Sequence, residues 1–379
     1  MVSTLFSLKN LSFSYDGKKK AIEDINLDIY PNKKTVFVGS NGSGKSTIFL
    51  LLVGLLKPDQ GKIFYKGEEL KYDNTFLKSL RSEVSLVFQN PEHQIFCTTV
   101  EEDVAFGPLN LSLPREEVEK RVENALKITG LEDLRDAPIS NLSFGQKKRV
   151  AIAGALAMEP KAIVLDEPTA GLDIEMVHEL LELFEELVRD KISVILSTHD
   201  IETLWEWADD LVVLNKGKVL YTGDVQSFYL NQDKIMHQVG ISPPLSFQLN
   251  FYLHERKKTK LLPFPRSYVE LIEKLIPAGH KKTGQLTIVL VDKKTPQEIS
   301  NLKVEHNKTG VVGSYARKLA KENLISVHHK FHAIENALLE IRNGNDFVLF
   351  SHSSLLDFIN DRISSFEKFS KIKAKIKII

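Results

Sequence analysis

The 379-residue chain contains a single cysteine, Cys97, so it can form no internal disulfide and no cysteine-based metal cage. We interpret Cys97 as a small buried hydrophobic side chain. An excess of charge of one sign is also lacking, because 50 Lys and Arg are matched by 50 Asp and Glu. A global basic field for nucleic acid is therefore excluded, no nucleic-acid partner is expected, and any phosphate site must be local.

Long hydrophobic runs are lacking as well. Nowhere does an uncharged apolar run reach the roughly 20 residues that a membrane-spanning helix needs. The N-terminal sequence MVSTLFSLKNLSFSY lacks the apolar segment of a secretory signal and alternates like a strand instead. If the protein works at a membrane, we expect a peripheral subunit on the cytoplasmic face.

Strands and helices are predicted to alternate through the first 200 residues. Residues 2–29 alternate apolar and polar positions around Asp16 and Gly17, which predicts an antiparallel hairpin sheet. Buried strands are predicted at 35–38, 84–88, 162–165 and 193–196, and helices at 46–53, 114–130, 147–158 and 175–189. This alternation predicts an α/β fold with a mostly parallel sheet and helices packed on it.

The pattern weakens after Gly223, and a domain boundary is predicted within residues 243–277, which are rich in proline and lysine. Beyond it, strands are predicted at 287–291, 309–312 and 347–350, and helices at 316–322, 332–342 and 354–360. We therefore divide the chain into residues 1–276 and a small C-terminal α/β domain, residues 277–379, for which regulation is one hypothesis. The alternating basic and apolar residues 368–379 predict an edge strand, and a membrane-surface strip is the alternative.

The stretch GSNGSGKST, residues 39–47, stands between a predicted strand and a predicted helix. It fits the pattern G-x-x-x-x-G-K-[ST], in which backbone N–H groups and the positive end of the helix hold phosphates. We expect Lys45 to reach the terminal phosphates and the Ser46 hydroxyl to bind Mg²⁺. The nucleotide-contacting residues expected in this glycine loop are Gly39, Ser40, Asn41, Gly42, Ser43, Gly44, Lys45, Ser46 and Thr47.

Two adjacent acids, Asp166 and Glu167, end the buried strand predicted at 162–165. Asp166 is expected to act on the Mg²⁺ side, mainly through a metal-bound water. Glu167 is the candidate base that orients or deprotonates the attacking water. On their own these acids would be interpreted as a charged strand end facing solvent, but together with the glycine loop they predict a nucleoside triphosphatase.

Residues 141–146, NLSFGQ, lie between the glycine loop and the acids and open a predicted helix. They resemble the signature motif of ATP-binding cassette proteins, LSGGQ, with Phe144 in place of the first central glycine. The resemblance implies that Ser143, Gly145 and Gln146 contact the ATP held by a partner subunit. It also implies a P-loop cassette fold with an antiparallel β subdomain, a mostly parallel core sheet with helices and a helical signature subdomain.

Four further positions match this family, and their roles follow from the resemblance. Tyr15 matches an aromatic that stacks on adenine, and Gln89 matches the lid glutamine near Mg²⁺ and the attacking water. Asp173, in the sequence GLD, matches the loop that crosses the dimer interface, and His199 matches the switch histidine at the γ-phosphate. Singly, each has an ordinary interpretation as a strand aromatic, a turn residue or a strand-end cap. Several matches in family order favour the functional interpretation.

The segments FQNPEHQIF, residues 88–96, and TVEEDVAFGPLN, residues 99–110, look like the ATPase subunit of energy-coupling-factor importers, in particular the cobalt and nickel branch. This resemblance covers roughly residues 2–276. It implies that two ATPase subunits, identical or paralogous, enclose two ATP molecules and that a coupling helix of a transmembrane subunit docks after the lid glutamine. The candidate docking residues are Ile95, Phe96, Glu101, Glu102 and Asp103; the alternative is ordinary packing and a solvated acidic turn.

Six of the eleven histidines fall after residue 279, beyond the family resemblance. His328, His329 and His332 could bind Ni²⁺ or Co²⁺, since imidazole suits these ions, and the alternative is surface histidines on a small α/β domain. The sequence GVVGS, residues 310–314, could hold an anionic effector at a helix N-terminus.

The sequence thus predicts an ATP-hydrolysing subunit of a metal-ion importer. A soluble cassette ATPase with a regulatory or binding role, for instance in DNA repair or translation, is one alternative. The other is a metal- or metabolite-sensing ATPase in which the C-terminal domain dominates. A transmembrane subunit that copurifies with this chain would distinguish the first hypothesis from the others.

Overall fold

The computed structural model describes residues 4–200, 205–276, 283–300, 308–323 and 325–379. The chain divides into two compact units, Met1–Met176 with Leu187–Ser242, and Val177–Glu186 with Pro243–Ile379. The second unit includes α10 (Leu245–Lys257) and α11 (Tyr268–Leu275), which the sequence patterns did not predict.

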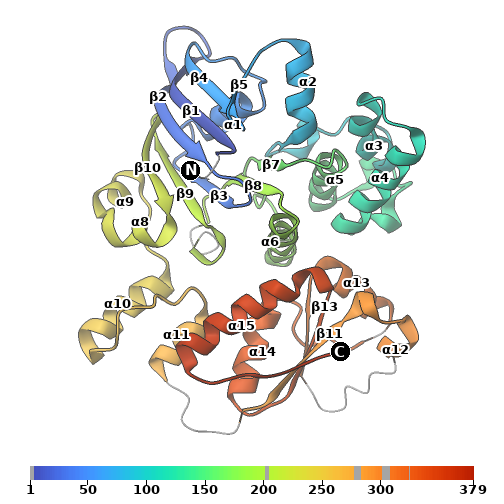
Figure 1. Ribbon diagram of the computed structural model, residues 1–379, viewed down its shortest axis with the longest axis vertical. Coiled ribbons are helices and arrows are strands. Elements are labelled where there is room, and N and C mark those ends of the chain that lie inside the picture. The colour runs from blue at the N-terminus through green and yellow to red at the C-terminus, as the bar shows by residue number, and fades with distance from the viewer. Residues whose placement is uncertain (1–3, 201–204, 277–282, 301–307, 324) are drawn as a thin grey trace. The chain divides into compact units, whose positions relative to one another are not determined.

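The first unit starts with an antiparallel sheet of four strands in the order β2-β1-β4-β5 (Figure 1). The strands are β1 (Phe6–Ser14), β2 (Lys20–Ile29), β4 (Gln60–Tyr65) and β5 (Glu68–Glu69). Phe6 of β1 lies opposite Ile29 on one side and Tyr65 on the other. The antiparallel hairpin predicted around Asp16 and Gly17 is confirmed.

A second, six-stranded sheet has the order β10-β9-β3-β8-β7-β6. Its strands are β3 (Lys34–Val38), β6 (Val84–Val87), β7 (Ala162–Leu165), β8 (Ser193–Ser197), β9 (Asp210–Asn215) and β10 (Lys218–Asp224). All neighbours pair in parallel except β10, which is antiparallel to β9. Because the carboxyl ends of parallel strands meet at one edge, the segments after β3, β6, β7 and β8 come together there.

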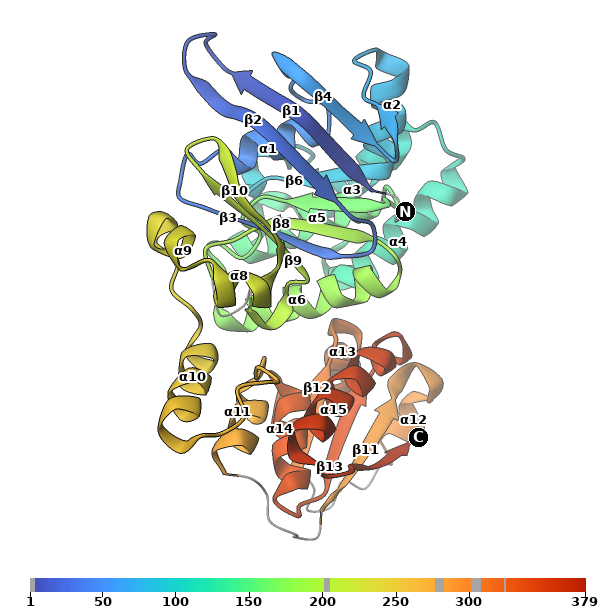
Figure 2. The same cartoon turned by 60° about the vertical axis from the view of Figure 1, so that its left-hand side comes forward.

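The core of this unit is formed by buried residues of both sheets and of α1 (Lys45–Leu52). Figure 2 shows α1 between the strands of the two sheets. Phe37 of β3 and Phe49 of α1 meet there with ring centroids 5.1 Å apart. Three helices that contact one another form the helical subdomain: α3 (Val100–Asn110), α4 (Arg115–Thr129) and α5 (Phe144–Leu156). Further described helices of this unit are α2 (Asn74–Glu83), α8 (Val225–Asn231) and α9 (Asp233–Val239). Residues of α6 (Ile174–Arg189) are divided between the two units.

The second unit contains a four-stranded parallel sheet in the order β12-β13-β11-β14. Its strands are β11 (Gln285–Leu290), β12 (Lys308–Val312), β13 (Phe347–Ser351) and β14 (Lys375–Ile378). Its helices are α12 (Pro296–Ser300), α13 (Ser314–Glu322), α14 (Ala333–Arg342) and α15 (Leu356–Ser370). Separate clusters of buried apolar residues cover its two faces. The strands and helices of residues 285–378 thus have an α/β arrangement, and β14 lies at an edge of the sheet.

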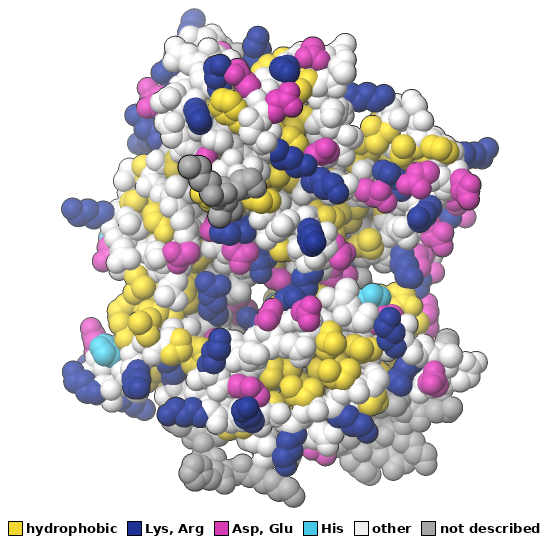
Figure 3. Space-filling model, viewed as in Figure 1, with side chains coloured by type: hydrophobic (Ala, Val, Ile, Leu, Met, Phe, Trp, Pro, Cys, Tyr) yellow, Lys and Arg dark blue, Asp and Glu magenta, His cyan; other side chains and the backbone are white. Residues whose placement is uncertain are grey.

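Charged side chains of both signs are interspersed over the face of the molecule in Figure 3, in keeping with the net charge of zero. Within the described parts of the chain, no helix has both the length and the apolar character needed to cross a membrane.

Gly61 and Gly67 offer a matched test of how closely β1 and β4 approach. Both have left-handed backbones, with φ of +84° and +86°, but a Cβ on Gly61 would lie 2.4 Å from the carbonyl oxygens of Lys9 and Asn10, whereas one on Gly67 meets nothing within 4 Å. Gly67→Ala should cost only the backbone strain, about 1–2 kcal/mol of unfolding free energy. Gly61→Ala should cost roughly 2 kcal/mol more, because the strands must separate. Urea unfolding measures both variants, and equal losses would contradict this close approach.

Candidate functional site

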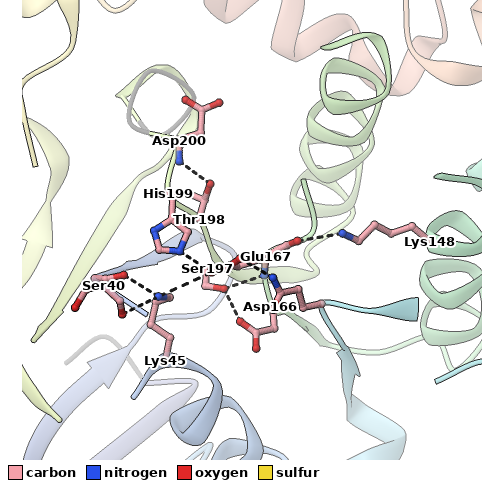
Figure 4. A network of polar contacts seen from close by, with 11 residues as sticks. Ser40, Lys45, Lys148, Asp166, Glu167, Ser197, Thr198, His199 and Asp200 are labelled. Carbon is pink, nitrogen blue, oxygen red and sulfur yellow. Dashed lines mark hydrogen bonds and ion pairs between the residues drawn. The ribbon is translucent and has the colours of Figure 1, made fainter. Parts of the chain in front are cut away.

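Charged and polar side chains gather at the carboxyl edge of the six-stranded sheet (Figure 4). The glycine loop follows β3, Asp166 and Glu167 follow β7, and His199 comes two residues after β8. Because β8 lies between β3 and β7 in the sheet, residues that follow it are next to both other segments. The strand order therefore assembles three motifs that are distant in the sequence.

The Lys45 ammonium is a buried cation at this edge, with the residue only 5% exposed. Its Nζ donates hydrogen bonds to the carbonyl oxygens of Gly39, at 2.7 Å, and Ser40, at 3.4 Å. It also lies 4.0 Å from Oε1 of Glu167. Burial lowers the pKa of Lys45, while the charges of Glu167 and Asp166 act in the opposite direction.

The glycine loop has the geometry that an anionic group requires. Gly42 and Gly44 are left-handed, with φ of +75° and +109°. α1 begins after Gly44 with no side-chain cap and no acid in its first turn, so the positive end of this helix is not neutralised locally. The Ser43 hydroxyl is buried without a hydrogen-bond partner among the described residues. These features fit phosphate oxygens.

The other predicted loop contacts lie around this turn. Ser40, Asn41 and Ser46 are exposed. The Tyr15 ring is exposed beside the loop, with its hydroxyl 3.1 Å from Oγ1 of Thr47. An aromatic face is thus available next to the glycine loop.

The Glu167 carboxylate is the centre of the polar network. Gln89 Nε2 donates to Oε2 of Glu167 at 2.9 Å, and His199 Nε2 lies 2.7 Å from Oε1. Glu167 itself has a left-handed backbone, with φ of +45°, which is uncommon for a residue with a side chain. The structure therefore brings together all three residues that the sequence assigned to catalysis.

Ser197, the last residue of β8, was missed by the sequence interpretation. Its fully buried hydroxyl donates to Oδ1 of Asp166 at 2.7 Å and accepts from the N–H of Glu167 at 2.9 Å. It therefore fixes both acids at once. The available signal was its position at the end of a predicted strand, one residue beyond the range assigned from the apolar pattern.

The signature residues form the start of α5. The Ser143 hydroxyl accepts from the N–H of Gln146 at 3.3 Å, and Oε1 of Gln146 accepts from the N–H of Ser143 at 2.8 Å. This reciprocal pair is a capping box, and it starts the helix three residues before the predicted position 147. A Cβ on Gly145 would lie 2.4 Å from Sδ of Met176, so the glycine permits close packing there.

Asp173 is exposed and caps α6, because its Oδ1 accepts from the N–H of Met176 at 2.8 Å. Ser143 is exposed as well. Both residues therefore have a local role as helix caps. Their side chains nevertheless lie on the surface of the first unit.

The three acids proposed for docking have partners at the start of α3. Glu101 pairs with Arg135 at 2.6 Å, and Glu102 forms a capping box with Thr99. Oδ1 of Asp103 accepts from the N–H groups of residues 96 and 97. These acids order the turn before α3, in addition to any contact with a partner.

A largely apolar groove of about 270 Å³ lies beside this turn. Phe96 and Phe106 border it, with ring centroids 4.6 Å apart and exposed fractions of 65% and 44%. Cys97, interpreted as buried, is only partly so, and its burial raises the pKa of the thiol. The groove is lined by Val53, Leu55, Arg81, Val84, Ser85, Leu86, Gln94, Phe96, Asp103, Phe106, Gly107, Ala151, Gly154, Ala155 and Met158.

The C-terminal histidines do not form a metal centre in the part of the chain that the structure describes, where no group of three His, Cys, Asp or Glu could hold an ion. Each of the three clustered histidines has a separate contact: His328 with the Thr309 hydroxyl, His329 with the Phe347 ring and His332 with the His178 ring. His328 is exposed, and His329 and His332 are partly buried. His280 and His306 lie outside the described residues.

A carboxylate of the protein itself occupies the loop suggested for an anionic effector. Within the second unit, the N–H of Gly313 donates to Oε2 of Glu182 at 2.7 Å, and Arg317 pairs with the same carboxylate. The positive end of α13 is thus neutralised internally.

The amino-acid sequence of this chain is similar to those of known proteins. The family model described as ABC transporter matches residues 22–170. The energy-coupling factor transporter ATP-binding protein EcfA2 of Methanospirillum hungatei is 32% identical over 374 residues, 96% of this chain and 94% of that protein. A putative ABC transporter ATP-binding protein of Methanosarcina mazei is 40% identical over 273 residues, 72% of this chain, and the chain spans 60% of its length.

Solved structures are similar to part of this chain. The structure of cbiO1 from Clostridium perfringens, described as part of the ABC transporter complex cbiONQ, has a TM-score of 0.55 and 39% identity, covering 63% of this chain and all of that one. A dimeric ATP-binding cassette in a post-hydrolysis state, bound to ADP and phosphate, has a TM-score of 0.53 and 29% identity, covering 58% of this chain and 98% of that one. The predicted cassette fold is confirmed.

Proposed function

Because this chain belongs to the family of ABC transporter ATP-binding cassettes, we propose that it is the ATP-hydrolysing subunit of an energy-coupling-factor importer at the cytoplasmic face of the membrane. The observation that carries the proposal is the convergence of Gln89, His199 and Lys45 on the Glu167 carboxylate. A candidate base next to a phosphate-binding lysine is the arrangement that hydrolysis of a phosphoanhydride requires.

Binding of ATP is assigned to the glycine loop and Tyr15. The N–H groups at the start of α1 and the Lys45 ammonium neutralise phosphate oxygens, and the exposed Tyr15 ring stacks on the base. Ser46, Gln89 and Asp166 would hold Mg²⁺; all three carry oxygen donors, which suit this ion. When bound, Mg²⁺ neutralises charge that develops on the phosphate oxygens.

Hydrolysis is assigned to Glu167 with two positioning contacts. Its carboxylate accepts the proton of the attacking water, or orients that water toward the γ-phosphate. The hydrogen bond from Gln89 and the contact with His199 hold the carboxylate in one orientation. Ser197 fixes the backbone below it, so the base is preorganised before ATP arrives.

A second ATPase subunit, identical or paralogous, completes each site. Ser143 and Asp173 are exposed, which leaves them accessible to a partner, and we assign Ser143, Gly145 and Gln146 to the ATP held by that partner. The dimeric ADP-bound relative supports this arrangement. Closure then requires ATP, and hydrolysis releases it, which converts phosphate chemistry into movement of the attached transmembrane subunit.

The apolar groove beside α3 is the docking site that we assign to a coupling helix of the transmembrane subunit. Exposed aromatic side chains at its border, Phe96 and Phe106, are typical anchors for an amphipathic helix. Cobalt or nickel is the proposed solute, supported by the resemblance in residues 88–96 and 99–110.

Transport by the complex tests the proposal. The chain is coexpressed with the transmembrane subunits, and uptake of radioactive cobalt and nickel is measured with the wild type and with Glu167→Gln. We expect metal uptake that depends on Glu167. Uptake that is unaffected by the substitution would contradict the assignment of this chain as the ATP-hydrolysing subunit. A complex that transports another micronutrient would contradict the assignment of cobalt or nickel as the solute.

The docking assignment predicts that the double variant Phe96→Ala, Phe106→Ala loses the transmembrane subunit. Removal of two exposed anchors should weaken copurification by about tenfold or more. Tyr252→Ala is the matched control, since Tyr252 is an exposed aromatic on α10, outside the groove. Equal recovery of the transmembrane subunit with both variants would show that the helix docks elsewhere.

A further inference from the structure

Two adjacent lysines on α5 have opposite environments. The Lys147 side chain is 20% exposed and pairs with Glu92 at 2.8 Å. Lys148 is only 1% exposed, and its Nζ donates to the carbonyl oxygen of Glu167 at 3.1 Å (Figure 4). The same Nζ donates to the carbonyl oxygen of Ala170 at 3.0 Å. Burial of an amine is costly unless it is hydrogen-bonded, so these carbonyl contacts compensate for the lost water.

The two carbonyls belong to the turn that follows β7. The N–H of Ala170 donates to the carbonyl oxygen of Glu167 at 3.1 Å and closes a turn between these two residues. Lys148 therefore donates hydrogen bonds to the first and the last residue of the turn. Glu167 is the left-handed residue from which the carboxylate projects. A movement of Lys148 would therefore rotate the peptide that aims this carboxylate. Burial lowers the pKa of Lys148 to about 8, while the Glu167 charge opposes the shift.

Phe144, which stands where the signature motif has a glycine, belongs to the same cluster. Its ring centroid lies 5.5 Å from Nζ of Lys148. A Cβ on Gly171 would lie 3.0 Å from the Phe144 ring, so the ring packs directly on the backbone of the loop after Ala170. The N-terminal part of α5 thus contacts this loop through the buried ammonium of Lys148 and the aromatic ring of Phe144.

We infer that Lys148 is a positioning residue for hydrolysis, and that Lys148 and Phe144 connect the signature turn of α5 to the catalytic Glu167 of the same chain. The inference rests on the proposed function. Ser143, at the start of this turn, is assigned to the partner's ATP, whereas Glu167 acts on the ATP of its own chain. Lys148 and Phe144 therefore couple binding of the partner's ATP to the orientation of the Glu167 carboxylate.

The test compares Lys148→Met, which keeps the length of the side chain but removes the ammonium, with Lys147→Met on the same helix. We expect Lys148→Met to lower kcat by roughly tenfold to hundredfold, because small misplacements of a catalytic group have effects of this size. Its ATP affinity and KM should stay within about twofold of the wild type, since ground-state binding does not use the base. Lys147→Met should match the wild type in kcat, KM and melting temperature.

Phe144→Ala is the second variant, because Phe144 is partly exposed and its loss leaves the core intact. It should lower kcat in the same direction by about threefold or more, again without loss of ATP affinity. If Lys148→Met does not fold, the kcat of Phe144→Ala tests the inference. A folded Lys148→Met or Phe144→Ala with wild-type kcat overturns the inference, as does a parallel loss of kcat and ATP affinity. A wild type without Glu167-dependent hydrolysis would instead overturn the proposed function.

Discussion

Glu167→Gln is expected to bind ATP as the wild type does and to hydrolyse it about 10²–10⁴-fold more slowly. Glutamine preserves the shape of the side chain and its contacts with Gln89 and His199 but cannot accept the proton of the attacking water. Lys45 keeps its hydrogen bond to the Gly39 carbonyl and the glycine loop is unchanged, so the affinity for nucleotide is kept. Phosphate release and binding of a fluorescent ATP analogue measure the two properties separately.

The matched control for this substitution is Glu68→Gln, which removes an exposed carboxylate paired with Lys71 on the antiparallel sheet. Its hydrolysis rate should equal that of the wild type. A Glu167→Gln protein with unchanged turnover would remove Glu167 from the reaction, and one that fails to bind ATP would show that the carboxylate serves the binding site instead.

Lys45→Ala is expected to weaken ATP binding by roughly tenfold to hundredfold, the effect of losing a hydrogen bond between charged groups. The ammonium is buried at the glycine loop, and no other described lysine has its Nζ within 4.0 Å of the Glu167 side-chain oxygens. Isothermal titration of ATP against the purified variant measures the affinity directly.

Lys62→Ala serves as its control, because Lys62 is an exposed lysine paired with Glu69 in the first unit. It should bind ATP as the wild type does. Normal ATP affinity in Lys45→Ala would contradict the assignment of the glycine loop to the phosphates.

The sequence predicted the cassette part of the fold because its strands are short apolar runs and its motifs have fixed spacing. The buried strands found at β3, β6, β7 and β8 lie within one or two residues of the predicted ranges. Two helices of the second unit, α10 and α11, were not predicted, because their apolar residues share the segment with prolines and lysines that indicate a linker. Tertiary packing decides their structure more than local pattern does.

The site was predicted residue by residue through motif spacing, but its supporting contacts were not. Sequence spacing does not tell which of Lys147 and Lys148 is buried, because α5 buries residues on most of its faces and therefore has no clear polar side. Ser197 and Lys148 form hydrogen bonds with the backbone N–H and carbonyl of Glu167. Side-chain patterns in a sequence do not predict contacts of this kind. Histidine is a suitable ligand for Ni²⁺ or Co²⁺, but the described C-terminal histidines do not come together in a group of three that could hold an ion.

A mixing experiment tests most directly that each ATP is enclosed by two subunits. The wild-type chain purified alone can pair only with itself and should hydrolyse ATP with Mg²⁺, whereas Lys45→Ala and Ser143→Ala should each be inactive alone. In an equal mixture, half of the dimers combine one intact glycine loop with one intact signature turn, so about a quarter of the wild-type rate should return. An active wild type with a mixture that stays as inactive as its components would contradict the shared site.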